Sequence, residues 1–359
     1  MNKPNIATAF ARRSRQYAEH RSGPNAGRAI YLDLFKTLLI YGMVTAHVIQ
    51  LLGLRLGDGA ARFSDFVNLI SFSGYMLAFG IGIGLSKASR QRSPWQRFKP
   101  ALVILACYYV SGLAFAVLVS RSQMTADLII DLLTLRVLFG YSEFLASFFV
   151  LYLVIALLRP LLIAIADKPP MLVIAIIVCL AGTALTINQL VPLAGTIVGH
   201  TKYASFPLLP YLPWFLIGIR LGRQDGRPGW IETALALVAT AAFGYFLVHT
   251  GWNLPERFPP SVLWIVGPAL ILLIYLIFAR SIADNLPLPS PLLAPGRHVL
   301  AALIVSNLII FSIDHFYYKP AHPLWVALAI SVGVLAAATL WCGAIDLWST
   351  RSKRPAARR

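Results

Sequence analysis

The segment IYLDLFKTLLIYGMVTAHVIQLLGL, residues 30–54, is the first of several long apolar runs that decide the fold of this chain. About 20 apolar residues are enough for a helix to cross the ~30 Å hydrocarbon core of a bilayer, so the segment is long enough to span a membrane. It also contains Asp33, Lys36 and His47, which fall on one narrow stripe of a helix at about 100° per residue. Ionisable side chains in hydrocarbon are costly and usually face a bundle interior or a water-filled cavity. The stripe is therefore the first candidate functional site.

The composition of the whole chain is that of a polytopic membrane protein. Of 359 residues, 58% are hydrophobic and 13% are charged, which excludes an ordinary soluble domain. The apolar runs predict an all-α integral membrane bundle of about ten transmembrane helices in one domain, residues 30–345. Residues 1–29 form a basic N-terminal segment and residues 346–359 a basic tail, and segments 1–29 and 351–359 are predicted to be disordered or to lie on the lipid surface. The predicted spans are residues 30–54, 66–86, 99–120, 143–166, 170–190, 206–222, 229–249, 261–279, 297–315 and 323–345.

The net charge of +17 follows the predicted topology. If the N-terminus is cytoplasmic, 23 of the 31 Lys and Arg residues lie on cytoplasmic segments and seven on outer segments. This bias matches the positive-inside rule and predicts that both termini are cytoplasmic. Attraction to anionic lipid head groups then accounts for the basic excess, and no nucleic-acid partner is expected. The span count, with no eukaryotic sorting feature, favours a bacterial inner membrane.

The three cysteines are predicted to be structural. Cys107, Cys179 and Cys342 all fall inside predicted spans, where a cysteine behaves as a small apolar residue. We therefore predict no disulfide and no metal site. Three glycines of the second span, Gly80, Gly82 and Gly84, are spaced so that another helix backbone can approach closely.

Five motifs follow one another along the chain: Leu32-Asp33-Leu34-Phe35-Lys36 with His47, Ser73-Gly74-Tyr75, FPLLPYLPWFLIG at 206–218, Arg257-Phe258-Pro259-Pro260-Ser261, and Pro295-Gly296-Arg297. In this order they resemble the multi-pass membrane acyltransferase superfamily, which includes the acyltransferase-3 proteins and the heparan-α-glucosaminide N-acetyltransferase-like proteins. The resemblance covers residues from about 28 to 345 and is closer to the second group in its last two motifs.

The resemblance implies transfer of an acyl group, usually acetyl from cytoplasmic acetyl-CoA, to a sugar hydroxyl or amine at the outer face. The family pattern places a basic residue and then, after ten residues, a histidine in the first span, and Lys36 and His47 keep this spacing. Most members carry Arg at the position of Lys36, and lysine keeps the charge but not the bidentate fork. Many members also carry a His in the late span where this chain has Ile304-Val305-Ser306-Asn307, so Asn307 is not predicted to be catalytic.

The candidate catalytic residues are His47, Lys36, Asp33 and Glu143. His47 lies about 16 Å of helix rise beyond Lys36, towards the outer half of the span, whereas Asp33 and Lys36 lie nearer the donor side. A neutral imidazole can take a proton from the attacking hydroxyl or amine, or it can accept the acyl group itself, and the sequence leaves both open. Glu143 begins the fourth span at the outer side, where it could orient His47 or share a proton with it.

Four arginines on predicted cytoplasmic segments are candidates for pairing with the phosphates of acyl-CoA. They are Arg220, Arg223, Arg90 and Arg297. The expected partners are thus the lipid bilayer, an acyl-CoA donor with acetyl-CoA first, and a carbohydrate or glycolipid acceptor.

Two other functions fit parts of the sequence. In a proton-coupled secondary transporter for a sugar derivative, Asp33, Lys36 and His47 would form a proton path. No pair of broken helices in equivalent halves is visible, which counts against transport. A membrane scaffold without chemistry would leave the charged stripe unexplained.

Overall fold

The computed structural model describes residues 29–53, 57–86, 94–317 and 323–352, and within these ranges it contains helices and no strand. The predicted all-α membrane bundle is confirmed. The longer helices are α2 (Ile30–Leu52), α3 (Gly57–Leu85), α4 (Pro94–Ala114), α6 (Glu143–Asp167), α7 (Pro169–Ala181), α9 (Leu208–Arg223), α10 (Trp230–His249), α12 (Ala269–Asn285), α14 (Val299–Phe316) and α15 (Leu324–Ser352). Shorter helices are α5 (Ala126–Thr134), α8 (Ala194–Val198), α11 (Val262–Val266) and α13 (Ser290–Arg297).

Eight helical stretches of the described chain are long and apolar enough to cross a membrane, where the sequence predicts ten spans. The two that differ are 170–190, which forms the shorter α7, and 206–222, which forms the 16-residue α9. Helix α7 begins next to its predicted start but ends at Ala181, where Gly182–Ala184 form a 3₁₀ turn. Helix α9 keeps nearly its predicted bounds, but it begins after Pro207 and its 16 residues are short for a span. At the other end of the chain, α15 continues to Ser352, beyond the predicted start of the tail at residue 346.

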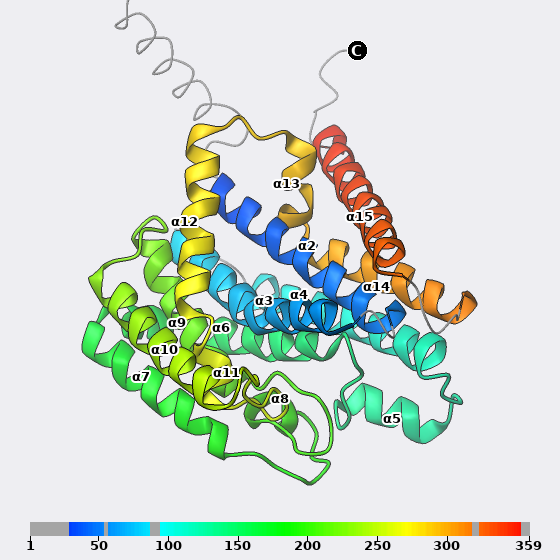
Figure 1. Cartoon of the computed structure of the whole chain (residues 1–359), viewed down its shortest axis with the longest axis horizontal. Helices are drawn as coiled ribbons and strands as arrows, with labels where there is room; N and C mark the ends of the chain where they lie inside the picture. The colour runs from blue at the N-terminus through cyan, green and yellow to red at the C-terminus, as the bar shows by residue number, and fades with distance from the viewer. Residues whose placement is uncertain (1–28, 54–56, 87–93, 318–322, 353–359) are drawn as a thin grey trace, which may run out of the picture.

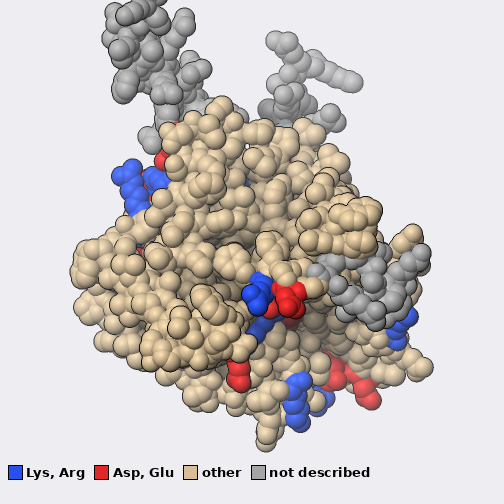
Figure 2. Space-filling model, viewed as in Figure 1, with Lys and Arg blue, Asp and Glu red and all other residues tan. Residues whose placement is uncertain are grey.

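The polar helices lie at the centre of the bundle and the apolar helices at its rim. Helices α2 and α3 run through the middle, with α7 and α10 on one side and α14 and α15 on the other (Figure 1). Most residues of α2 and α3 are buried, whereas few of those of α10 and α15 are. The large side chains exposed on the outer helices are apolar, such as Leu157 of α6 at 68%, Val238 of α10 at 71% and Leu340 of α15 at 74% exposure. A surface of this kind suits lipid, and Figure 2 shows a largely uncharged face with a few small clusters of charge.

Helices α3 and α9 touch through their backbones. A Cβ atom on Gly80 would collide with the carbonyl oxygen of Phe215, and one on Gly218 would collide with that of Leu77. Gly84 and Gly222 repeat the arrangement one turn further along. The predicted close approach is therefore confirmed at Gly80 and Gly84. Gly82 instead has only a side-chain atom of Leu32 at 4.0 Å from a Cβ position.

A second close backbone contact joins α13 to α2. The Gly296 N–H donates to Oγ1 of Thr37 over 2.9 Å, and that hydroxyl donates to the carbonyl oxygen of Asp33 over 2.9 Å. A Cβ atom at Gly296 would collide with the same Asp33 carbonyl oxygen. The Pro295-Gly296-Arg297 motif therefore packs directly against the first turns of α2.

Candidate functional site

A cavity of about 300 Å³ lies where α2, α3 and α6 meet the connection between α10 and α11. Aromatic side chains form much of its wall, and polar side chains from four separate segments also line it. The polar residues are His47 and Gln50 of α2, Asn68, Ser71 and Tyr75 of α3, Tyr141 and Glu143 at the start of α6, and Arg257 of the α10–α11 connection.

Hydrogen bonds fix the orientation of the His47 ring. Nδ2 of Asn307, in α14, donates to the carbonyl oxygen of Tyr141 over 3.0 Å. A carbonyl can only accept, so this bond orients the amide and turns Oδ1 of Asn307 towards His47. Oδ1 lies 3.3 Å from Nδ1 of His47. Since Oδ1 also only accepts, Nδ1 carries the proton of the neutral ring and Nε2 presents a lone pair.

Nε2 of His47 is left for a ligand. No described residue forms a hydrogen bond with it, and His47 lines the cavity. The edge of the ring meets the face of Tyr141, with centroids 4.7 Å apart and planes at 85°. One ring nitrogen is thus held by the protein, and the other is available to a bound molecule.

A small network of hydrogen bonds holds the side chain of Asn307 in place. Its Nδ2 also lies 3.3 Å from Oγ of Ser111 in α4, and Ser142 donates to the same Ser111 oxygen over 2.6 Å. Asn307, Ser111 and Ser142 are all buried. Satisfied buried networks of this kind specify one arrangement of the helices. The network therefore sets the position of His47 through α4, α6 and α14.

Glu143 lines the same cavity as His47, as the expected partnership requires. Its side chain is buried, and Oε2 has no hydrogen-bond partner among the described residues. Nδ2 of Asn68 and the hydroxyl of Tyr75, both cavity residues, are likewise buried without a partner. Most buried polar atoms in folded proteins are paired, so an accumulation around one cavity points to a polar ligand there.

Arg257 is the cation nearest this cavity, and the Arg257-Phe258-Pro259-Pro260-Ser261 motif positions it. Ser261 caps α11 by accepting from the Trp264 N–H over 3.2 Å, and the Ser261 N–H donates to the carbonyl oxygen of Glu256 over 3.0 Å. Burial lowers the pKa of the Arg257 guanidinium, while the nearby Glu143 acts in the opposite direction. The motif thus holds one partly buried positive charge against the cavity.

Asp33 and Lys36 lie away from the cavity, in the other half of α2. They form an ion pair with Nζ to Oδ1 at 2.9 Å, and Thr37 beside them contacts α13. About 16 Å of helix rise separates Lys36 from His47. The structure therefore brings His47 and Glu143 to one cavity and pairs Asp33 with Lys36 at a second place.

Three of the four arginines considered for acyl-CoA, namely Arg220, Arg223 and Arg297, already form ion pairs within the chain. Arg220 pairs with Glu232 at 2.5 Å, and Arg223 pairs with Asp167 at 2.5 Å. Arg90 lies outside the described residues. A phosphate at Arg220 or Arg223 would have to share the guanidinium with a carboxylate or displace it.

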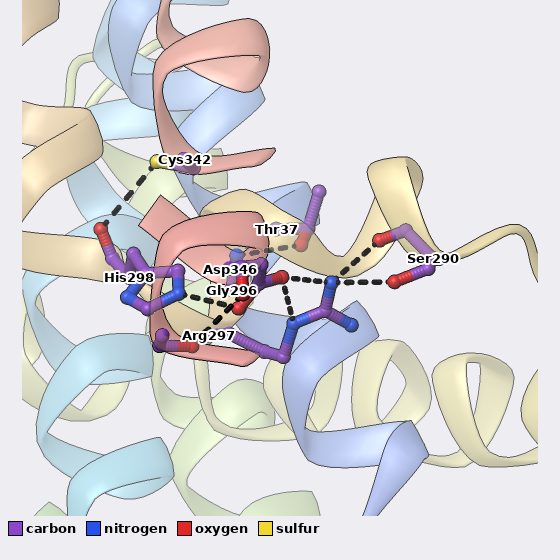
Figure 3. Close-up of polar contacts among 8 residues, drawn as sticks. Thr37, Ser290, Gly296, Arg297, His298, Cys342 and Asp346 are labelled. Atoms are coloured by element: carbon purple, nitrogen blue, oxygen red, sulfur yellow. Dashed lines mark hydrogen bonds and ion pairs between the residues drawn. The ribbon is translucent and has the colours of Figure 1, made fainter. Parts of the chain in front are cut away.

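Arg297 fastens α13 to α15. Its Nε donates to Asp346 over 2.9 Å and its NH2 group donates to the Ser290 carbonyl over 2.8 Å, while His298 Nε2 lies 2.7 Å from the other Asp346 oxygen (Figure 3). The Gly296–Thr37 contact lies beside this cluster. The position of Arg297 is therefore explained by these contacts within the chain, without an acyl-CoA phosphate.

The sequence alone does not predict two residues of this site. Asn307 stands where many members of the resembled family carry His, and in the structure it orients His47. Arg257 belongs to a quoted motif without an assigned role, and it lines the cavity. Two features of the sequence could have indicated them: Asn307 is an asparagine in an apolar span, and Arg257 stands among aromatic and proline residues.

Comparison with protein-family models, with curated proteins and with solved structures found no match for this chain.

Proposed function

We propose that the chain is a membrane acyltransferase that moves an acyl group, with acetyl first, from cytoplasmic acyl-CoA to a carbohydrate or glycolipid acceptor. The observation that carries this proposal is the oriented His47, whose Nδ1 faces Asn307 at 3.3 Å and whose Nε2 is available in a cavity of about 300 Å³. A neutral histidine held in one tautomer beside a ligand cavity is the arrangement that general-base catalysis needs. The family resemblance of the Lys36–His47 spacing supports the same chemistry.

The transfer step uses the lone pair on Nε2. As the acceptor oxygen or nitrogen attacks the thioester carbonyl carbon, Nε2 takes the proton of the acceptor group. The new C–O or C–N bond forms, the C–S bond breaks, and the proton passes from Nε2 to the departing thiolate or to water. Asn307 Oδ1 accepts from Nδ1 throughout and stabilises the imidazolium that forms. Glu143, on the same cavity, supplies a carboxyl group to hold the acceptor or to share the proton.

The site belongs to the outer half of the membrane under the proposed topology. The excess of basic residues on the segments assigned to the cytoplasm supports cytoplasmic termini, and with them a bacterial inner membrane. The ends of α9 and α12 carry Arg220, Arg223 and Arg280 on that side, opposite to the end that holds Arg257. The donor would then be bound from the Asp33–Lys36 half and the acceptor from the His47 half.

The test is acyl-CoA turnover by the full-length protein purified in detergent. We expect release of free CoA thiol from acetyl-CoA that depends on added glycan acceptor, and an acylated product of matching mass. The matched control is His315→Ala, since His315 is near the end of α14, outside the cavity, where its Nδ1 contacts the Leu118 carbonyl oxygen at 3.0 Å. No turnover with any acyl-CoA, together with proton-dependent sugar accumulation in proteoliposomes, would replace this proposal with the transporter.

A further inference from the structure

The guanidinium of Arg257 is a charged group of the cavity that has no role in the proposed acyl-transfer step. Its Cζ lies 4.6 Å from the ring centroid of Phe258 and 5.7 Å from that of Phe206. Its Nε atom is buried and has no hydrogen-bond partner, and no carboxylate of the described chain lies within ion-pair distance of the guanidinium. Aromatic contacts hold the cation in place without neutralising it.

A partly buried guanidinium without an anion is costly, because it has lost water and gained no opposite charge. The charged group that acts on it most is Glu143, which lines the same cavity without touching it. Both side chains line one cavity of about 300 Å³. Arginine forms bidentate hydrogen bonds to carboxylates and phosphates, so the missing partner is an oxyanion.

We propose that the cavity binds a sugar that carries a carboxylate, such as a uronic acid, and that Arg257 binds this carboxylate while Nε2 of His47 faces the group to be acylated. The binding site stands on the cavity alone, whereas the role of the sugar as acceptor rests on the proposed function.

The charge balance favours a carboxylate over a phosphate. A carboxylate brings one negative charge to the single guanidinium, whereas a phosphate monoester brings about −1.5 to −2 at neutral pH, so the repulsion from Glu143 is smaller for the carboxylate. The remaining polar groups suit hydroxyls: Nδ2 of Asn68 and the hydroxyl of Tyr75 are unpartnered, and Gln50 also lines the cavity. The volume of about 300 Å³ is at the small end for ligand pockets, as expected for one sugar residue.

The test compares three probes with the full-length protein in detergent: methyl glucuronide, methyl glucoside and methyl glucoside 6-phosphate. Binding is measured by titration calorimetry and acylation by product mass. We expect the parent to bind the glucuronide at least about tenfold more tightly than the neutral glucoside, as for a charge-assisted hydrogen bond. In Arg257→Gln the affinities for glucuronide and glucoside should be about equal. The matched control is Arg62→Gln, an exposed arginine near the start of α3 and outside the cavity, which should keep the parent preference.

Arg257→Lys keeps the charge without the fork and should retain an intermediate preference, which serves if the Gln variant does not fold. The comparison of glucuronide and glucoside binding by the parent protein tests the inference without any variant. Equal binding of glucuronide and glucoside, tighter binding of the 6-phosphate, or an unchanged preference in a folded Arg257→Gln would each overturn the inference. If glucuronide binds through Arg257 but no acyl-CoA is consumed with it, the site stands and the acyltransferase fails. If both neutral and charged sugars are acylated equally, the acyltransferase stands and the role of Arg257 fails.

Discussion

Nδ1 of His47 in α2 lies 3.3 Å from Oδ1 of Asn307 in α14, and the contact joins residues that are 260 positions apart. The backbone carbonyl of Tyr141 decides which way the Asn307 amide faces, and hence which nitrogen of His47 carries the proton. The chemistry proposed for the cavity depends on this relationship, and its consequences can be measured.

His47→Ala should abolish acyl transfer and leave the protein inserted and folded. Loss of a general base typically lowers the rate by about 10²–10⁴-fold, whereas loss of a packing histidine lowers stability and leaves turnover per folded molecule intact. Turnover and thermal unfolding are measured on the same detergent preparation. A variant that melts at a lower temperature but transfers acyl groups at the parent rate would show His47 to be structural.

Asn307→Leu should lower turnover by about 10–100-fold, since the tautomer of His47 would no longer be fixed. It should also lower the melting temperature, because Ser111 and the Tyr141 carbonyl lose a partner in the interior. The matched control is Ser306→Ala, the buried neighbour whose hydroxyl bonds only to its own helix at Leu303. If both variants lose turnover equally, Asn307 has no special part in positioning His47.

Lys36→Arg should keep activity, and Lys36→Met should lose most of it. Lys36 pairs with Asp33 at 2.9 Å, and removing the cation takes away the ion pair of a carboxylate in low dielectric. The double variant Asp33→Asn/Lys36→Met separates the two explanations. Recovery of the melting temperature without recovery of turnover indicates that the charge itself serves the reaction, while equal activity of Lys36→Met and the parent shows that it is incidental.

Gly80→Ala should destabilise the protein by about 1–3 kcal/mol, because its Cβ would meet the carbonyl oxygen of Phe215. Gly333→Ala in α15 is the matched control, since nothing lies within 4 Å of a Cβ at that position. The control should be neutral or slightly stabilising through helix propensity. The measurement is thermal unfolding in one detergent, and similar melting temperatures for the two variants would contradict the backbone contact.

Residues 87–99 should be cytoplasmic and residues 249–261 should lie outside, because the basic residues segregate that way. Single cysteines at the exposed positions Gln96 and Trp252, in a chain without Cys107, Cys179 and Cys342, allow labelling with an impermeant maleimide in intact cells. Only the cysteine at 252 should react before the membrane is opened. Labelling of both from one side would remove the proposed topology.

Hydropathy predicts the helices well because each one follows from local composition. It overestimates the length of α7, which ends at Ala181 in a 3₁₀ turn although the apolar run continues, and it gives α9 nearly its observed bounds. The polar residues of α2 and α3 lower the hydropathy of these two helices below that of the other spans, and these two are the central, most buried ones.

The site is predictable only where one helix carries the pattern. The periodicity of α2 predicts His47 as a functional candidate and places Asp33 and Lys36 on the same face, and helix rise predicts that His47 lies away from these two, towards the outer side where Glu143 begins its helix. The structure agrees with this separation, since His47 and Glu143 line one cavity and Asp33 and Lys36 do not. That the first two line a common cavity depends on the packing of α2 against α6, which one sequence does not give. Asn307 and Arg257 join the cavity through contacts between distant segments, for which a single sequence has no periodic signal.

The meeting of the α3 and α9 backbones at Gly80, Gly84, Gly218 and Gly222 has a mechanical consequence for the cavity. Helices whose main chains are in contact at two successive turns resist sliding and tilting past each other, so α3 and α9 behave as one rigid unit. This unit includes the polar cavity residues of α3, which are Asn68, Ser71 and Tyr75, so the wall of the cavity that they form keeps its shape. Any widening that admits a sugar then has to come from the other walls of the cavity, among them the connection between α10 and α11 that carries Arg257 and Phe258.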